Sequence, residues 1–298
     1  MYDTILVPTD GSDHAVRAAG HGLSLARAFD ATVHVVSAVD VQAAAGPFDV
    51  GGVGDDFVAR LEAKAEETID AVEAIADESD DVRTAVLRGT PSDAILEYAD
   101  DHDAELIAMG THGRSGLKRY IAGSVTERVV RLADVPVLTT RATERSRVGD
   151  GYEEILVPTD GSELAAAAIE HGIAIAQRFD ARVHAVNIVD VSGIAATPNY
   201  TPPIELIERY ESEGEAATER IATVARDAGL DAVTEVREGF SAVDLLEYAD
   251  ENDIDLIAMG TAGRSGLDRF LLGSTTERVI RRADVPVVAV NPGESADD

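Results

Sequence analysis

The same glycine-rich stretch occurs twice in this chain, 150 residues apart. "GTHGRSGLKRYIAGSVTE" spans residues 110–127, and "GTAGRSGLDRFLLGSTTE" spans residues 260–277. "ILVPTDGS" begins at Ile5 and again at Ile155, and 24 of 37 positions are identical between residues 104–140 and 254–290. A repeat this long predicts two copies of one domain rather than a solenoid of short units. We place the first domain at residues 1–141, a polar linker at 142–152, the second domain at 153–292 and a disordered acidic tail at 293–298.

Each copy alternates short apolar runs with amphipathic segments. In the first half, apolar runs rich in β-branched residues predict strands over residues 4–9, 31–39, 82–87, 105–110 and 135–140. Helical spacing of apolar residues predicts helices over 12–29, 55–78, 91–101 and 124–133. Apolar strands separated by helices predict an α/β domain whose parallel sheet is covered on both faces. Residues 41–55 and 191–203 follow no regular pattern, and we interpret them either as lids over a ligand or as surface loops.

The composition excludes several classes of function. The chain has no cysteine, so disulfides and thiolate metal sites are absent. Its formal net charge of −31 repels nucleic acid and anionic membranes, and we expect neither as a partner. No apolar run approaches the ~20 residues of a membrane span, so we expect a cytoplasmic protein. The acidic residues are spread over both halves, 27 before Gly151 and 29 from there on, which is typical of a surface adapted to high salt.

The repeated stretch has the pattern of an anion site. A glycine-rich loop between a strand and a helix lets backbone N–H groups approach a phosphate, and the helix dipole adds positive potential. Gly110, Gly113 and Gly116 follow the strand, and Gly123 directly precedes Ser124. Ser124-x-x-Glu127 and Ser274-x-x-Glu277 also have the spacing of a helix capping box. A cap alone does not require three earlier glycines in both halves, so we favour the phosphate site; neither a Walker A loop nor a G-x-G-x-x-G fingerprint occurs.

A carboxylate follows the first strand of each half, in the sequence Pro-Thr-Asp-Gly-Ser. In open α/β sheets, ligands bind beyond the carboxyl ends of strands where the winding reverses. If the first and fourth strands flank that point, Asp10 faces the Gly110 loop and suits ribose hydroxyls or a phosphate-bound metal. Equally, Asp10, Gly11 and Ser12 are turn residues, with Ser12 as a helix N-cap. The residues leave both interpretations open.

The pattern G-x₂-G-x₉-G-[ST] resembles the ATP-binding signature of the universal stress protein family. It occurs at Gly110, Gly113, Gly123 and Ser124, and again 150 residues later. "PTDGS" and "ADVPV" fit the family too, once per half over nearly the whole chain, and the acidic composition suggests a halophilic archaeal member. The resemblance implies two tandem five-stranded parallel-sheet Rossmann-like domains of the adenine nucleotide alpha hydrolase-like type, with strand order 3-2-1-4-5. It also implies that the fifth strands pair, either as a pseudo-dimer within one chain or between chains as a homodimer.

The same resemblance assigns site residues in each half. In the first half, the triphosphate site comprises Gly110, Gly113, Gly123, Ser124 and Val125, with Asp10 by the ribose, Pro8 and Thr9 shaping the pocket, and Ala38 beside adenine. In the second half, the matching residues are Gly260, Gly263, Gly273, Ser274, Thr275, Asp160, Pro158, Thr159 and Ile188. Arg114 and Arg264 are either phosphate contacts or surface charges. The expected cofactor is ATP, with Mg²⁺ possible at Asp10 and Asp160.

The halves differ beside the glycine loop. His112, Lys118 and Ala122 correspond to Ala262, Asp268 and Leu272. Replacing a lysine near a phosphate site by an aspartate weakens anion binding, so we predict two competent sites with the second weaker.

No set of residues in the sequence predicts catalysis. The seven histidines have no metal-ligand spacing, and no nucleophile lies beside a general base in any recognisable motif. His21 and His171, like His34 and His184, repeat within helix and strand patterns and are interpreted as packing or surface residues. We therefore expect an ATP-binding, nucleotide-sensing stress-response module rather than an enzyme. The alternatives are a slow Mg²⁺-dependent ATPase or phosphotransferase, and a stress protein that holds partner proteins and binds nucleotide incidentally.

Overall fold

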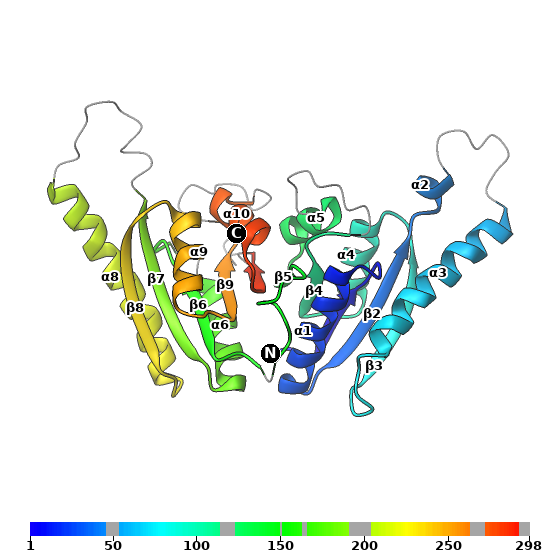
Figure 1. Ribbon diagram of the computed structural model, residues 1–298, viewed down its shortest axis with the longest axis horizontal. Helices are drawn as coiled ribbons and strands as arrows, with labels where there is room; N and C mark the ends of the chain where they lie inside the picture. Colours follow the sequence, from blue (N-terminus) through cyan, green and yellow to red (C-terminus); the bar gives the residue numbers. More distant parts are fainter. Residues whose placement is uncertain are drawn as a thin grey trace, which may run out of the picture. The chain divides into compact units, whose positions relative to one another are not determined.

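The structure, a computed structural model, describes residues 1–45, 54–113, 123–149, 151–162, 166–190, 204–262 and 272–291 (Figure 1). Contacts divide the chain into two units, Met1–Val148 and Gly149–Asp298. Each unit is an α/β domain built on a parallel sheet, as the alternation of apolar runs and amphipathic segments predicts.

The first unit contains five strands and five helices among its described residues. In chain order they are β1 (Thr4–Pro8), α1 (Asp13–Phe29), β2 (Thr32–Val39), α2 (Val41–Ala45), α3 (Asp55–Glu73), β3 (Val82–Arg88), α4 (Pro91–Asp101), β4 (Leu106–Gly110), α5 (Ser124–Leu132) and β5 (Val137–Thr140).

The second unit repeats this order. Its elements are β6 (Glu154–Pro158), α6 (Ala166–Phe179), β7 (Arg182–Asp190), α8 (Ile204–Asp227), β8 (Ala232–Gly239), α9 (Ser241–Glu251), β9 (Leu256–Gly260), α10 (Ser274–Arg282) and β10 (Val287–Val290).

Within each unit the strand order is the expected 3-2-1-4-5. The first unit has the order β3-β2-β1-β4-β5 and the second the order β8-β7-β6-β9-β10, with every described pairing parallel. The chain winds outward from β1 to β3 and then crosses to β4 on the other side of β1. Right-handed crossovers place α1 and α3 on one face and α4 and α5 on the other. The winding therefore reverses between β1 and β4.

The central strands form the core of each unit. Ile5, Leu6 and Val7 of β1 are fully buried, as are Ile155, Leu156 and Val157 of β6. Strands buried on both faces are expected to be continuously apolar, which explains the sequence runs. None of the helices in the described ranges is long and apolar enough to cross a membrane.

Two expected segments differ in the structure. The helix from Asp55 ends at Glu73 instead of residue 78, because the chain turns before β3 and Asp80 caps that turn by accepting a hydrogen bond from Asp77 N at 2.8 Å. Within residues 41–55, which showed no pattern, the short helix α2 forms. The other patternless segment, 191–203, and the predicted tail, 293–298, lie outside the described residues.

The start of the predicted linker lies along α1 of the first unit. Arg17 Nη1 donates to Thr143 O at 3.1 Å, and the ring of His21 lies 2.9 Å from Ser146 O through Nε2. Ala142 N donates to His14 Nδ1 at 3.0 Å. Three side chains of α1 therefore bind the backbone of residues 142–146.

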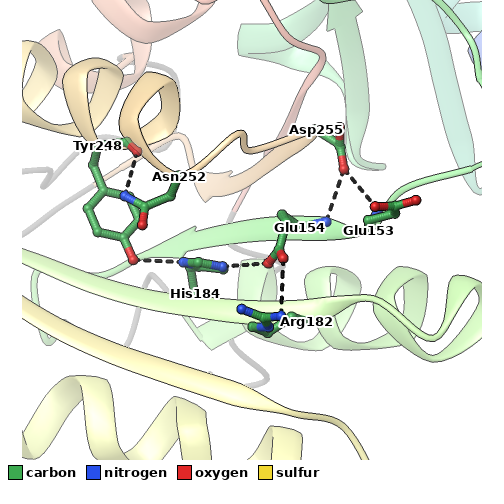
Figure 2. A network of polar contacts seen from close by, with 7 residues as sticks. All are labelled: Glu153, Glu154, Arg182, His184, Tyr248, Asn252 and Asp255. Carbon is green, nitrogen blue, oxygen red and sulfur yellow. Dashed lines mark hydrogen bonds and ion pairs between the residues drawn. The ribbon is translucent and has the colours of Figure 1, made fainter.

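A buried polar network ties α9 to the sheet of the second unit (Figure 2). His184 on β7 lies between Tyr248 OH, 2.7 Å from Nδ1, and Glu154 Oε2, 2.6 Å from Nε2. Arg182 pairs with the same carboxylate at 3.5 Å. The first unit has the corresponding contact between His34 and Tyr98 at 3.1 Å, but Thr4 stands where the second unit has Glu154.

Candidate functional site

A cavity of about 460 Å³ opens at the carboxyl ends of β1, β2 and β4 in the first unit. It lies where the winding reverses, which is where open α/β sheets bind ligands. All nine predicted site residues of the first half that the structure describes line it. They are Pro8, Thr9, Asp10, Ala38, Gly110, Gly113, Gly123, Ser124 and Val125.

Backbone contacts hold the two described ends of the glycine loop together. Gly123 N donates to Thr111 O, and Thr111 N donates to Thr140 O at 3.0 Å. The hydroxyl of Thr126 in the first turn of α5 donates to Gly110 O at 2.7 Å. The helix start is thereby fixed against the last residue of β4. Thr276 makes the same bond to Gly260 O at 2.7 Å in the second unit.

The capping-box interpretation of Ser124 and Ser274 is wrong. The N-caps of α5 and α10 are Gly123 and Gly273, and neither helix start has a side-chain capping bond. Each serine is already the first helical residue, so its hydroxyl is not at the capping position. The first amides of a helix have no intrahelical acceptor. At α5 these amides belong to cavity-lining residues, an arrangement suited to an anion.

Close approach explains two glycines of the loop. A Cβ on Gly110 would lie 2.6 Å from the backbone carbon of His14, so only glycine lets β4 end against the start of α1. A Cβ on Gly113 would lie 2.5 Å from Asp10 Oδ2. Glycine at residue 113 therefore lets the Asp10 carboxylate lie against the loop backbone, inside the cavity.

Asp10 makes the expected turn and also lies in the cavity. Its Oδ1 accepts from Ser12 N at 3.0 Å, which closes a turn, and Ser12 Oγ caps α1 by accepting from Ala15 N at 3.2 Å. The carboxylate nevertheless lines the cavity. Asp160 makes the same turn with Ser162 N at 2.9 Å.

Sequence reasoning assigned Ala38 of β2 to the site but missed Ser37 beside it and the wall contributed by α3. Ser37, Lys64 and Thr68 line the cavity, and the hydroxyl of Thr68 lies 3.1 Å from that of Ser37. Lys64 is one of only two lysines in the chain, which was an available signal. The helix that carries Lys64 has no motif that points to a ligand, so only the packing of the helix on the sheet shows that Lys64 lines the cavity.

The second unit arranges its matching residues on the matching elements. Pro158 ends β6, Thr159 and Asp160 follow it, Ile188 lies in β7, Gly260 ends β9, and Gly273, Ser274 and Thr275 start α10. The wall from β7 and α8 is different, because Asn187 replaces Ser37 and the buried Gly214 of α8 lies against Asn187. Asn187 Nδ2 donates to Thr159 O at 2.7 Å. Arg114, Gly263 and Arg264, with Lys118, Ala122 and Asp268, lie outside the described residues.

Histidines lie at the glycine-loop end of the first cavity. His112 lines the cavity, and its ring centroid lies 5.2 Å from that of His14. Burial lowers the pKa of His112, and Arg141 lowers it further. Burial also lowers the pKa of His14, with His112 and Arg141 acting in the same direction and Asp13 and Asp10 opposing them.

The described residues contain no group of three or more histidine, aspartate or glutamate side chains that could hold a metal ion. Mg²⁺ is commonly held by one or two carboxylates together with substrate phosphates. Among the described residues, two carboxylates, Asp10 and Asp40, line the cavity. They fit Mg²⁺ only together with a bound phosphate chain.

Comparisons with known proteins agree with the fold. The universal stress protein family matches residues 1–141 and again residues 151–291. A universal stress protein of Methanocaldococcus jannaschii is 41% identical over 139 residues, which are 47% of this chain and 82% of that protein. The crystal structure of a universal stress protein from Archaeoglobus fulgidus covers 98% of this chain and 97% of its own, with 22% identity and a TM-score of 0.70.

A further solved structure is a universal stress protein in complex with cAMP. It is 27% identical to this chain, covers 48% of it and 99% of its own length, and has a TM-score of 0.37. Because the family matches both halves over nearly their whole length, the chain belongs to the universal stress protein family, with two such domains in tandem.

Proposed function

We propose that this chain is an ATP-binding module of the stress response, with a phosphate cradle in each half. The cavity of about 460 Å³ carries the proposal, because nine residues assigned through the family resemblance line it together. Its volume lies within the ~300–1,000 Å³ of small-molecule sites. Its lining includes glycines that admit close backbone approach and a helix start without a side-chain cap.

The cavity suggests how the nucleotide lies. The phosphates sit at Gly110, Gly113 and the amides that begin α5, where N–H groups and the helix dipole favour negative charge. The ribose lies by Asp10, and the base lies beside Ala38 at the end of β2. Mg²⁺, where present, binds the phosphates with Asp10 or Asp160 as its protein ligand, and Arg114 and Arg264 are proposed phosphate contacts.

We propose that the second site binds more weakly. Ile188 and Asn187 are larger than Ala38 and Ser37, which leaves less room at the base end. The described residues of the cavity supply no nucleophile paired with a general base, which favours nucleotide occupancy over turnover.

A pair of matched substitutions tests the two cradles in the full-length chain. Ser124→Asp and Ser274→Asp each place a carboxylate at the first position of a helix, where it suits the dipole but repels a phosphate. Calorimetric titration with ATP should give two sites in the unaltered chain and one in each variant, with affinity at the altered site at least about a hundredfold weaker. Ser79→Asp is the control for added charge, because Ser79 lies in the turn before β3, at the amino ends of the strands and away from the cavity.

Three results would overturn parts of the proposal. Absence of ATP binding to the unaltered chain would remove it, and equal stoichiometry in all variants would move the site elsewhere. Labelled ATP converted to ADP in a single-turnover assay with Mg²⁺ would instead support the slow ATPase. Unchanged stability on ATP addition would favour a protein that holds partner proteins.

Two further expectations stay proposals. Pairing of β5 with β10, or a homodimer through these edges, is tested by light scattering and by proline substitution of Leu138 or Val288. Adaptation to concentrated salt predicts that the unfolding midpoint rises with KCl, because salt screens the repulsion within a chain of net charge −31.

A further inference from the structure

Three basic side chains lie at the glycine-loop end of the first half, and none of the three recurs in the second half. His112 lines the cavity, the ring of His14 lies 5.2 Å from it, and Arg141 is near enough for its charge to lower the pKa of His112. His14, His112 and Arg141 have the counterparts Leu164, Ala262 and Asn291. All three basic side chains are thus replaced by neutral ones, although the glycines and the helix start between them are repeated. The substitutions are concentrated where the proposed phosphates end.

The hydrogen bonds of His112 identify the nitrogen that can meet a ligand. Thr111 Oγ1 donates its proton to Thr140 O at 3.3 Å, so it accepts from Nδ1 of His112, 3.1 Å away. This bond places the proton of the neutral ring on Nδ1 and leaves Nε2 to gain or lose one. Ser12 Oγ donates to His112 O at 3.2 Å and holds the backbone of this residue beside the cavity.

The neighbours of His112 keep it neutral in the absence of a ligand. Burial and Arg141 both lower its pKa. His14 is also held neutral, because its Nδ1 accepts from Ala142 N at 3.0 Å and cannot carry a proton while it does so. Among the described residues, the other charged groups that face this end are Asp10 and Asp13. Asp40, which follows β2, and Lys64 of α3 line the same cavity.

We propose that His112 and Arg141 recognise the terminal phosphate of a nucleoside polyphosphate in the first half, and that the second half lacks this recognition. The proposal rests on nucleotide binding at the cradles. The first half then selects a triphosphate over a monophosphate, whereas the second discriminates less. A phosphate beside His112 favours the charged imidazole, so binding takes up a proton and the first-half affinity rises as pH falls.

Swapping residues between the halves tests the proposal in the full-length chain. Ser274→Asp leaves the first cradle open, and Ser124→Asp leaves the second open. ATP, AMP and inorganic triphosphate are titrated into each by calorimetry at about pH 8 and pH 6, in two buffers of different ionisation enthalpy, which counts the protons taken up. His112→Ala with Arg141→Asn gives the first half the second-half residues, and Ala262→His with Asn291→Arg does the reverse.

We expect the ratio of ATP affinity to AMP affinity to be about tenfold larger in the first half, as one charge-assisted contact would give. His112→Ala with Arg141→Asn should lower ATP affinity about tenfold, leave AMP affinity unchanged and abolish proton uptake. The reverse swap should raise the ratio in the second half. Equal ratios in the two halves, or an equal loss of ATP and AMP affinity in the double variant, would overturn the proposal.

Inorganic triphosphate separates this proposal from the proposed function. Triphosphate binding that depends on His112, without binding of any adenine nucleotide, would refute ATP binding and retain the basic recognition site. ATP binding to both halves with equal ratios would refute only the recognition site. If neither ligand binds either half, both proposals fail.

Discussion

The two halves share the backbone on either side of the glycine loop but differ in the side chains near it. Both halves have the same strand ends and the same helix starts, at Ser124 and Ser274. In both, a threonine hydroxyl donates to the last carbonyl of the strand, Gly110 O or Gly260 O. The first-half cavity, however, is lined by Ser37 and His112, for which the second half has Asn187 and Ala262. A site that holds phosphate through backbone amides tolerates such changes, because its N–H groups do not depend on side-chain identity.

Lowering the pH should destabilise the first half more than the second, through His21 on α1, and this is the largest difference that we expect. Burial lowers the pKa of His21 to about 4, whereas an unfolded histidine titrates near 6.5. Since the folded pKa is the lower one, stability is complete above about pH 6.5 and falls toward pH 4 by about 3 kcal/mol. Burial also lowers the pKa of His171 in α6.

His21→Gln should reduce the loss of unfolding free energy between about pH 6.5 and pH 4, because the glutamine amide can still donate to Ser146 O but does not titrate. Urea unfolding at several pH values, with hydrogen exchange measured separately for peptides of each half, checks the prediction. His171→Gln is the matched control and should reduce this loss in the second half by less. A loss unchanged by His21→Gln would refute the role of this histidine.

Substitutions of Gly214 and Asn187 in the second half should have non-additive effects on the free energy of unfolding. We expect no such coupling in the first half. A Cβ on Gly214 would lie 2.5 Å from Asn187 Oδ1 and 3.2 Å from Val236 Cγ1. Gly214→Ala should therefore lower the free energy of unfolding by about 2 kcal/mol through overpacking. In an Asn187→Ser background, which copies Ser37, most of this cost should disappear.

A first-half control for this double-mutant cycle is Lys64→Ala, alone and with Ser37→Asn. Lys64 is exposed, so its truncation should cost little. Denaturant unfolding of the single and double variants gives the coupling energy. Additive effects of Gly214→Ala and Asn187→Ser would contradict the predicted contact.

The buried network in Figure 2 should stabilise the second half only. Glu154→Thr copies Thr4 and leaves His184 Nε2 without its carboxylate partner at 2.6 Å. We expect a loss of about 1–2 kcal/mol, measured by the exchange of β7 amides. Glu105→Thr is a control for loss of an acidic side chain near the same edge of the first sheet, and no change in β7 exchange after Glu154→Thr would show the network to be dispensable.

The threonines that start the two helices should give equal effects. Thr126→Val and Thr276→Val each remove one hydroxyl that donates at 2.7 Å to the last carbonyl of the preceding strand. Each should cost about 1 kcal/mol and weaken ATP binding at its own half only. Clearly unequal losses of stability would show that the two threonine hydrogen bonds contribute differently, which would contradict the predicted equality of the two helix starts.

Local pattern predicted most of the fold. Apolar runs marked the five strands of the first half, and the repeat extends the pattern to the second. The turn after β1 was among the interpretations because Asp10, Gly11 and Ser12 carry turn and cap chemistry within three residues. The capping-box prediction was wrong because local spacing alone did not determine where the helix begins. Ser124-x-x-Glu127 has the right spacing, but the chain enters the helix at Gly123, whose amide is bound to Thr111 O.

By itself, the sequence determined the duplication, the strand order through the family resemblance, and the glycines of the cradle, because these depend on residues that are close together or repeated. Only the tertiary structure placed Lys64 and Ser37 in the cavity wall and buried His21 against Ser146. Those contacts join elements far apart in the chain. Whether a lysine on an amphipathic helix meets a ligand or water depends on how that helix packs on the sheet, and no local pattern encodes that geometry.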